Sequence, residues 1–399
     1  MTDLAHAAHP ALPDDAAGAT LAGRVWRPDV AGPAVVAIRD GSVFDVTRSF
    51  ATMRDLTEHA DPAAALHAAL DDPSAAAESL GPLDAILANT PPEARDPARP
   101  WLLAPVDLHA VKAAGVTFAI SLLERVIEER ARGDVHSAAA IRAEVTRLVG
   151  DDLSRLRPGS PEAAHLKQAL IAQNAWSQYL EVGIGPDAEI FTKCQPMAAV
   201  GTATDAGLHP GSSWNNPEPE VVLAVSSAGR IAGATLGNDV NLRDVEGRSA
   251  LLLSKAKDNN ASCAIGPLLR LFDAGFTLDD IRRTTVTLRV AGEDGFVLQG
   301  SSSIARISRD PEDLVAQMVN AHHPYPDGAV LFLGTMFAPV EDRDTPGEGF
   351  THKSGDIVTI AAPKLGRLVN RMRPTDQCAR WTFGTGALMR NLAARGLLA

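Results

Sequence analysis

The strongest constraint on the fold of this chain is a change in the character of its sequence after Gly183. From there to about Pro363, short apolar runs typical of β-strands alternate with turns of Gly, Asn and Asp. Only residues 311–323 interrupt this pattern with the spacing of a helix. The sequence therefore predicts a long β-dominated body.

The residues before this body have a different character. Strand-like runs fill residues 21–46, with Asp40-Gly41 as a hairpin turn, and a helical segment follows with Asp61 as its N-cap. A connector that holds five prolines covers residues 90–105, and we place a domain boundary there. Helical spacing then returns in three segments, at residues 116–134, 136–157 and 160–182.

These patterns together predict an α+β protein. Its expected parts are a flexible tail (1–18), a small N-terminal α/β domain (19–100) and a main β domain (101–399) that carries a helical insert at about 134–183.

Composition narrows the class of protein. The 399 residues are 45% hydrophobic and 22% charged, which is typical of a soluble globular protein. The formal net charge of -12 argues against a protein that binds nucleic acid or an anionic membrane. We see neither a secretory signal nor an apolar run that would cross a membrane. The three cysteines, Cys194, Cys263 and Cys378, lack metal-site spacing and indicate free thiols, so we expect a cytoplasmic protein.

Carboxylates flank an apolar hairpin within the β body. Glu218 and Glu220 are two residues apart at the start of a predicted strand, so their side chains point to one face. The chain turns at residues 228–230 and returns, which brings Asp239 back to the same end. Three neighbouring carboxylates repel one another unless a cation lies among them, and oxygen ligands favour Mg²⁺, with Mn²⁺ or Ca²⁺ as alternatives. A lone Glu-x-Glu pair is usually a solvated strand end, but the polar residues around this hairpin favour a metal site.

Two further segments carry candidate binding residues. Lys255 and Lys257 lie on one face if their segment is extended, and the loop after them is small and polar. A lysine there can bind a carboxylate or move a proton, although most lysines are surface groups. An apolar strand ends at Gly334-Thr335, where backbone N–H groups and a hydroxyl are available to an anionic ligand.

Several spaced blocks together resemble the fumarylacetoacetate hydrolase family. They are EPE (218–220), GATLGNDVNLRD (233–244), KAKDNNASCAIGP (255–267), FTKCQPMAAVG (191–201) and GAVLFLGT (328–335). The resemblance implies a mixed β-sandwich roll, a homodimer or homotetramer, and a small 2-oxo acid substrate that chelates a divalent metal. It implies that the metal is held by Glu218, Glu220 and Asp239, and that Lys255 is the active-site lysine. It also implies a substrate site lined by Ser121, Arg243, Lys257 and Thr335.

One departure from the family pattern bears on the reaction. Hydrolytic members carry a His and a Glu three residues apart on a lid helix, whereas here Ser121 stands in place of the histidine and Glu124 remains. Serine cannot act as an imidazole base near neutral pH, so hydrolysis is disfavoured. The pattern resembles the branch of dehydratases that act on 2-keto-3-deoxypentonates. In such a reaction a bound metal acidifies the C3 protons, and Glu124 or Lys255 removes one before the C4 hydroxyl leaves.

We therefore expect a Mg²⁺-dependent hydro-lyase of pentose catabolism, which converts a 2-keto-3-deoxy-D-pentonate (arabinonate or xylonate) to 2-oxoglutarate semialdehyde. The alternatives are a metal-dependent acylpyruvate or fumarylacetoacetate-type hydrolase, an oxaloacetate decarboxylase, and a subunit that kept the fold but lost catalysis. The sequence has no GxGxxG or Walker-type loop, which argues against a nucleotide-binding enzyme.

Overall fold

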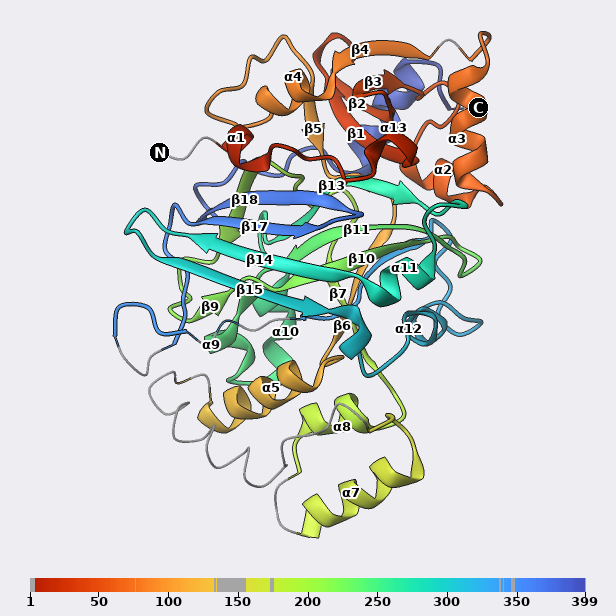
Figure 1. The fold of residues 1–399 in the computed structure, drawn as a ribbon. Helices are drawn as coiled ribbons and strands as arrows, with labels where there is room; N and C mark the ends of the chain where they lie inside the picture. The colour runs from red at the N-terminus through yellow and green to blue at the C-terminus, as the bar shows by residue number, and fades with distance from the viewer. Residues whose placement is uncertain are drawn as a thin grey trace.

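The protein is described by a computed structural model, which covers residues 4–75, 77–132, 134, 156–172, 176–336, 339, 341–345 and 349–398. Two β-sheets pack against each other at the centre, and helices lie at the two ends of the molecule (Figure 1). The α+β class predicted from the sequence is confirmed. None of the described helices combines the length and the apolar character that crossing a membrane requires.

The larger sheet has eleven strands and runs through the whole body. Its order is β4-β3-β2-β1-β13-β11-β10-β16-β6-β7, and β5 pairs with β1. Only the β16–β6 pairing is parallel among these. The strands are β1 (Leu21–Arg27), β2 (Gly32–Arg39), β3 (Ser42–Asp45), β4 (Glu78–Pro82), β5 (Trp101–Leu103), β6 (Ala110–Gly115), β7 (Glu189–Cys194), β10 (Pro219–Val225), β11 (Ile231–Asp239), β13 (Cys263–Leu271) and β16 (Ala329–Phe332).

A second sheet of five strands covers one face of the first. Its order is β15-β14-β17-β18-β8, with a parallel β18–β8 pairing. The strands are β8 (Thr204–Leu208), β14 (Thr285–Ala291), β15 (Val297–Ser303), β17 (Ile357–Ala362) and β18 (Gly366–Pro374). A separate short ladder joins β9 (Asn215–Asn216) to β12 (Asn241–Leu242).

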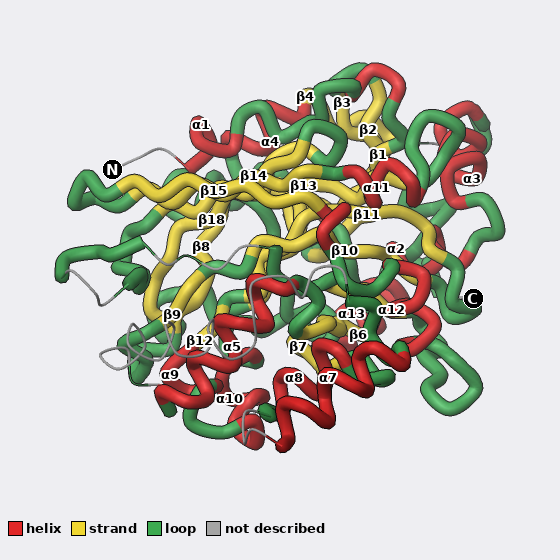
Figure 2. The backbone as a smooth tube through the Cα atoms, turned by 60° about the horizontal axis from the view of Figure 1, so that its bottom comes forward, coloured by secondary structure: helices red, strands yellow, loops and turns green. Residues whose placement is uncertain are grey.

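Helices fill the ends of the sandwich and the connections between its strands. Figure 2 shows α5, α9 and α10 gathered near the β9–β12 ladder. The helices are α1 (Leu4–Ala8), α2 (Met53–Glu58), α3 (Pro62–Asp71), α4 (Leu83–Ala88), α5 (Ala119–Ala131), α7 (Pro161–Ala172), α8 (Gln178–Ile184), α9 (Arg243–Glu246), α10 (Leu253–Lys257), α11 (Leu278–Arg283), α12 (Pro311–Met318) and α13 (Thr385–Ala394).

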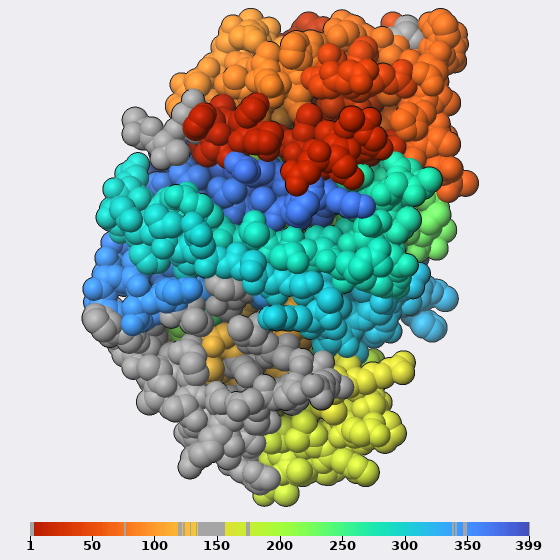
Figure 3. Space-filling view, viewed as in Figure 1, coloured from red at the N-terminus to blue at the C-terminus, as the bar shows by residue number. Residues whose placement is uncertain are grey.

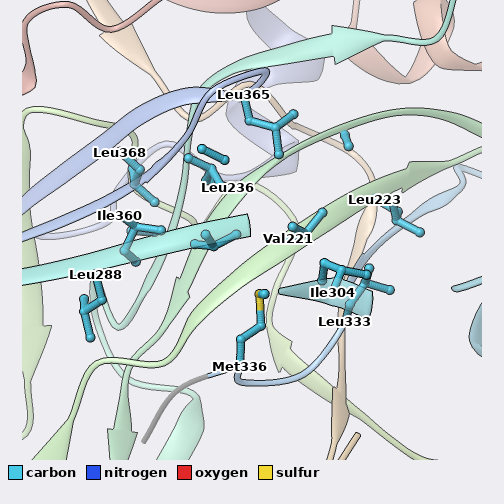
Figure 4. Close-up of a cluster of buried hydrophobic side chains, with 14 of the residues drawn as sticks. Val221, Leu223, Leu236, Leu288, Ile304, Leu333, Met336, Ile360, Leu365 and Leu368 are labelled. Carbon is cyan, nitrogen blue, oxygen red and sulfur yellow. The ribbon is translucent and has the colours of Figure 1, made fainter. Parts of the chain in front are cut away.

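Alternate residues of the β10–β11 hairpin enter two different cores. One set packs between the two sheets and includes Val221, Leu223 and Leu236 (Figure 4). The other set, which includes Val222, lies on the opposite face with Phe332. Because both faces of β10 are buried, the hairpin is a rigid support for the residues at its end.

The predicted N-terminal strands are confirmed, and they extend the larger sheet. The turn at Asp40-Gly41 joins β2 to β3, and both residues have positive φ, as a tight hairpin turn requires. Asp61 caps α3 by accepting from the N–H of Ala64. Since β1 pairs with β13, these strands belong to the same sheet as the hairpin. The division into domains at about residue 100 stays a prediction.

The prediction of a flexible tail is wrong for residues 4–18. Leu4, the first residue of α1, is only 1% exposed and packs in a hydrophobic core. Asp15 forms an ion pair with the guanidinium of Arg270, with an oxygen 2.5 Å from Nη1. In Figure 3 these first residues lie as a layer over the strands that end the chain. The tail is ordered because distant parts of the sequence supply its partners.

Two of the three helical segments predicted at residues 116–182 are helical in the structure, whereas the insert as a unit stays a prediction. The predicted helix at 116–134 is present as α5, and the segment 160–182 forms two helices, α7 and α8, instead of the single one predicted. Most of the helix predicted at 136–157 lies outside the described residues. The three cysteines are free, as predicted, and all three are buried.

Candidate active site

Glu218, Glu220 and Asp239 meet at one end of the β10–β11 hairpin. The register places Glu220 opposite Gly237, and the N–H of Asp239 donates to the C=O of Glu218 at 3.0 Å. One oxygen from each carboxylate lies within 4.8 Å of the others, and each residue is at most 2% exposed. The predicted convergence of the three acids is therefore confirmed.

Three cationic side chains face these acids. Nζ of Lys257 lies 2.6 Å from Oε2 of Glu218 and 3.1 Å from Oδ2 of Asp239. Nζ of Lys193 lies 2.8 Å from Oδ1 of Asp239, and the guanidinium of Arg125 on α5 contacts the other oxygen of Glu218. Buried carboxylates require such compensation, because an unpaired charge in the interior is very unfavourable.

The acids differ in how well their charges are compensated. Burial, and then the carboxylates of Asp239 and Glu218, raise the pKa of Glu220 well above its ordinary value. Burial also acts to raise the pKa of Asp239, but Lys193 and Lys257 outweigh it and hold that pKa below its ordinary value. The pKa of Lys257 is raised, because the attraction of Asp239 and Glu218 outweighs the effect of burial.

This donor set fits a hard divalent cation. It consists of three buried carboxylate oxygens close enough to share one ion, which are the ligands that Mg²⁺ and Mn²⁺ prefer. Glu220 carries no cationic partner among its described contacts, and its Oε2 accepts from the N–H of Gly334 at 2.6 Å. A cation among the three oxygens would remove the repulsion that raises the pKa of Glu220.

The lysine segment differs from its prediction. Lys255 and Lys257 would share one face if their segment were extended, but residues 253–257 form the short helix α10. In a helix, residues two apart point in nearly opposite directions. Lys257 is therefore buried against the acids, whereas Lys255, predicted to be the active-site lysine, is exposed on the other side of the helix.

The predicted lid residues lie beside this cluster. Glu124 on α5 is buried, and its Oε2 lies 3.6 Å from Nη2 of Arg243. The guanidinium of Arg243 also lies over the ring of Trp214, at 5.2 Å from its centroid. Ser121 belongs to the backbone of α5, but its side chain lies outside the described part of the structure. Glu124 and Arg243 therefore anchor α5 against the end of the hairpin.

The Gly-Thr segment after β16 closes the site on another side. Gly334 has φ of +99°, and a Cβ at this position would lie 1.9 Å from Oγ1 of Thr117. Only glycine fits there, which lets its N–H reach Glu220. Thr335 follows and is buried, and its role in binding the substrate stays a prediction.

Sequence reasoning missed Lys193 and Arg125, which contact the acids, and Glu189, whose pKa is influenced by Glu218 and Lys257. Glu189 opens β7 opposite Gly115, and its Oε2 lies 2.0 Å from where a Cβ of Gly115 would be, so the missing side chain makes room for this carboxyl. Burial, and then the negative charge of Glu246, raise the pKa of Glu189 to about 7. The block at residues 191–201 was a signal for Lys193, whereas nothing local in the sequence marks Glu189.

Several known proteins are similar to this chain in sequence. Residues 220–373 match the family model described as fumarylacetoacetate (FAA) hydrolase C-terminal. The chain is 30% identical over 188 residues to 2-dehydro-3-deoxy-D-arabinonate dehydratase of Saccharolobus solfataricus, covering 46% of this chain and 58% of the relative. It is 28% identical over 192 residues to a probable 2-keto-3-deoxyxylonate dehydratase of Haloferax volcanii, covering 48% and 62%. The chain thus spans about three fifths of the length of these curated relatives.

A solved structure shares the fold over most of the chain. It is that of 2-keto-3-deoxy-D-arabinonate dehydratase complexed with magnesium and 2,5-dioxopentanoate. The TM-score is 0.57 at 21% identity, and the match covers 89% of this chain and 99% of that one.

Proposed function

We propose that the chain is a metal-dependent dehydratase of 2-keto-3-deoxy sugar acids and a member of the fumarylacetoacetate hydrolase family, whose model matches residues 220–373. The observation that carries this proposal is the buried cluster of Glu218, Glu220 and Asp239 with Lys257 against it. The names of the two curated relatives support the same reaction class. The substrate that follows is a 2-keto-3-deoxy-D-pentonate, and the homodimer or homotetramer and the cytoplasmic location stay predictions.

The three carboxylates are the residues that would hold the metal. Mg²⁺ is the proposed ion, with Mn²⁺ or Ca²⁺ as alternatives, because all three ligands are hard oxygens. When bound, the ion supplies Lewis acidity to the keto group of a 2-oxo acid, which makes the neighbouring C3 protons more acidic.

We assign the two proton transfers to Glu189 and Lys257. Glu189 titrates near neutral pH, so it can accept a proton from C3. Lys257 is held protonated by Glu218 and Asp239, so it can give a proton to the departing C4 hydroxyl. One proton leaves C3, the C4–O bond breaks, and one water departs. For a five-carbon acid, tautomerisation through the C5 hydroxyl then gives 2,5-dioxopentanoate.

This assignment moves the predicted base away from Glu124 and Lys255. Glu124 lies against Arg243, which suits a residue that positions α5 over the site. Lys255 is exposed, which suits a surface lysine. With Ser121 where hydrolytic members carry histidine, we propose elimination of water in preference to hydrolytic cleavage.

Mass spectrometry of the product tests this function. The purified protein is incubated with racemic 2-keto-3-deoxypentonate and Mg²⁺, and the products are compared with those from a reaction that contains EDTA. We expect a single five-carbon product lighter by one water, formed only with the metal. Two carbon fragments would indicate a hydrolase, loss of carbon dioxide would indicate a decarboxylase, and either result would overturn the proposal.

A further inference from the structure

We infer that Asn216 and Asn241 form a polar subsite that binds the hydroxyl groups at the far end of the sugar acid, at C4 and C5. This inference rests on the proposed function, because it assumes that the carboxylate and keto end of the substrate lies at the acid cluster. These two residues would make the site prefer 2-oxo acids that carry hydroxyl groups.

The two asparagines continue the row of side chains that the acids begin. Asn216 pairs with Asn241 in the β9–β12 ladder, and Glu220 pairs with Gly237 in the β10–β11 hairpin. Both pairings have the same register, and Glu218 and Asp239 lie opposite each other between them. Side chains two residues apart on a strand share a face, so each asparagine lies next to one acid on the same face of the hairpin.

The row continues beyond the asparagines to α5. The next residues along the two strands are Trp214 and Arg243, which stack on each other, and Arg243 reaches Glu124 on α5. On the other side of the asparagines, Arg125 on the same helix contacts Glu218. The asparagine pair therefore lies between the acid cluster and the point where Arg243 meets α5.

Both asparagines are buried with amide groups that lack partners. Asn216 is 1% exposed and Asn241 is 0% exposed. Within the described residues, Oδ1 of Asn216 and both side-chain polar atoms of Asn241 make no hydrogen bond, whereas Nδ2 of Asn216 donates to the C=O of Pro217 at 2.9 Å. Buried amides are normally paired, because an unpaired one is unfavourable in the interior. A ligand that enters the site would supply the missing partners.

A hydroxyl group suits these atoms better than a carbonyl or a methyl group. Asn241 offers both a donor and an acceptor, and Asn216 offers a free acceptor. A hydroxyl both donates and accepts, so it can satisfy either residue. A substrate with an apolar tail would leave the amides unpaired, and sites of this kind discriminate strongly against analogues that lack the hydroxyl.

Calorimetric binding to the Mg²⁺-loaded protein tests the subsite without chemistry. The probes are 5-hydroxy-2-oxopentanoate and 2-oxopentanoate, neither of which carries the C4 hydroxyl that the reaction expels. We expect the wild type to bind the hydroxylated acid about tenfold more tightly, as one added hydrogen bond allows. Asn241→Ala should remove this preference while leaving the affinity for 2-oxopentanoate within about twofold, and Asn216→Ala should reduce the preference.

Asn215→Ala is the matched control. Asn215 is a buried neighbour whose amide is paired: Nδ2 donates to Oγ of Ser212 at 3.3 Å and Oδ1 accepts from the N–H of His352 at 3.2 Å. The control should lower the thermal midpoint and keep the preference, whereas Asn241→Ala should keep the midpoint and lose the preference. If Asn241→Ala retains the preference, or if its midpoint falls as far as that of the control, the inference is overturned. Failure of the wild type to bind either acid would instead count against the proposed function.

Discussion

Replacing Glu189 with glutamine is expected to stabilise the protein at pH 8 and to have a much smaller effect at pH 5. In the folded protein, burial and then the charge of Glu246 raise the pKa of this carboxyl from 4.5 to about 7. The unfolded chain therefore releases the proton at lower pH than the folded protein does. By linkage, the wild type loses stability as the pH rises from about 4.5 to about 7, and glutamine, which does not ionise, escapes this loss.

The size of the effect follows from the two pKa values. One pKa unit corresponds to about 1.4 kcal/mol, so the interval from 4.5 to about 7 corresponds to about 3 kcal/mol at a pH above both values. At pH 5 the carboxyl is largely ionised in the unfolded chain and still protonated in the folded protein. The loss of stability from this group is then only about 1 kcal/mol. The advantage of Glu189→Gln over the wild type should therefore grow by about 2 kcal/mol between pH 5 and pH 8.

Urea unfolding at pH 5, 6.5 and 8 measures the difference in stability between Glu189→Gln and the wild type. The solutions contain EDTA, so that metal binding does not contribute. Glu293→Gln is the control, because Glu293 is exposed and its replacement should shift stability little at any of these pH values. The reasoning is refuted if the advantage of Glu189→Gln is the same at pH 5 and pH 8, or if the variant is the less stable protein at pH 8.

Two further substitutions test positions at which the structure differs from the predictions made from the sequence. Lys257→Met should reduce turnover about 100-fold or more and Lys255→Met should not, because Lys257 contacts Glu218 and Asp239 whereas Lys255 is exposed. Steady-state kinetics that show equal losses would contradict this. Leu4→Ala should lower the free energy of unfolding by about 2–4 kcal/mol, because the Leu4 side chain is buried. If urea unfolding shows that this variant is as stable as the wild type, the packing of the N-terminal residues does not stabilise the protein.

The acid cluster was predictable because its causes are local. The apolar run after Glu220 and the turn before Asp239 set the pairing of one short hairpin, and strand alternation then fixes which side chains share a face. The turn at Asp40-Gly41 and the cap at Asp61 were found for the same reason, since each depends on neighbouring residues alone.

The features that were missed depend on residues far away in the sequence. The N-terminal residues pack because β17 and β18, near the other end of the chain, provide their surface. The helix α10 is a single short turn, too brief to show helical spacing, so Lys255 and Lys257 were read as extended. The position of Glu189 depends on the pairing of β7 with β6, and no local sequence pattern predicts that pairing.

The central claim is that the carboxylates of Glu218, Glu220 and Asp239 bind one divalent cation. Isothermal titration of the metal-free protein with Mg²⁺ measures this directly, with Asp239→Asn as the comparison and circular dichroism as a check that the variant is folded. We predict one Mg²⁺ per chain for the wild type and an affinity at least about 100-fold weaker for Asp239→Asn, which loses a charged ligand. Equal binding by the two proteins, or no binding by the wild type, would contradict the account.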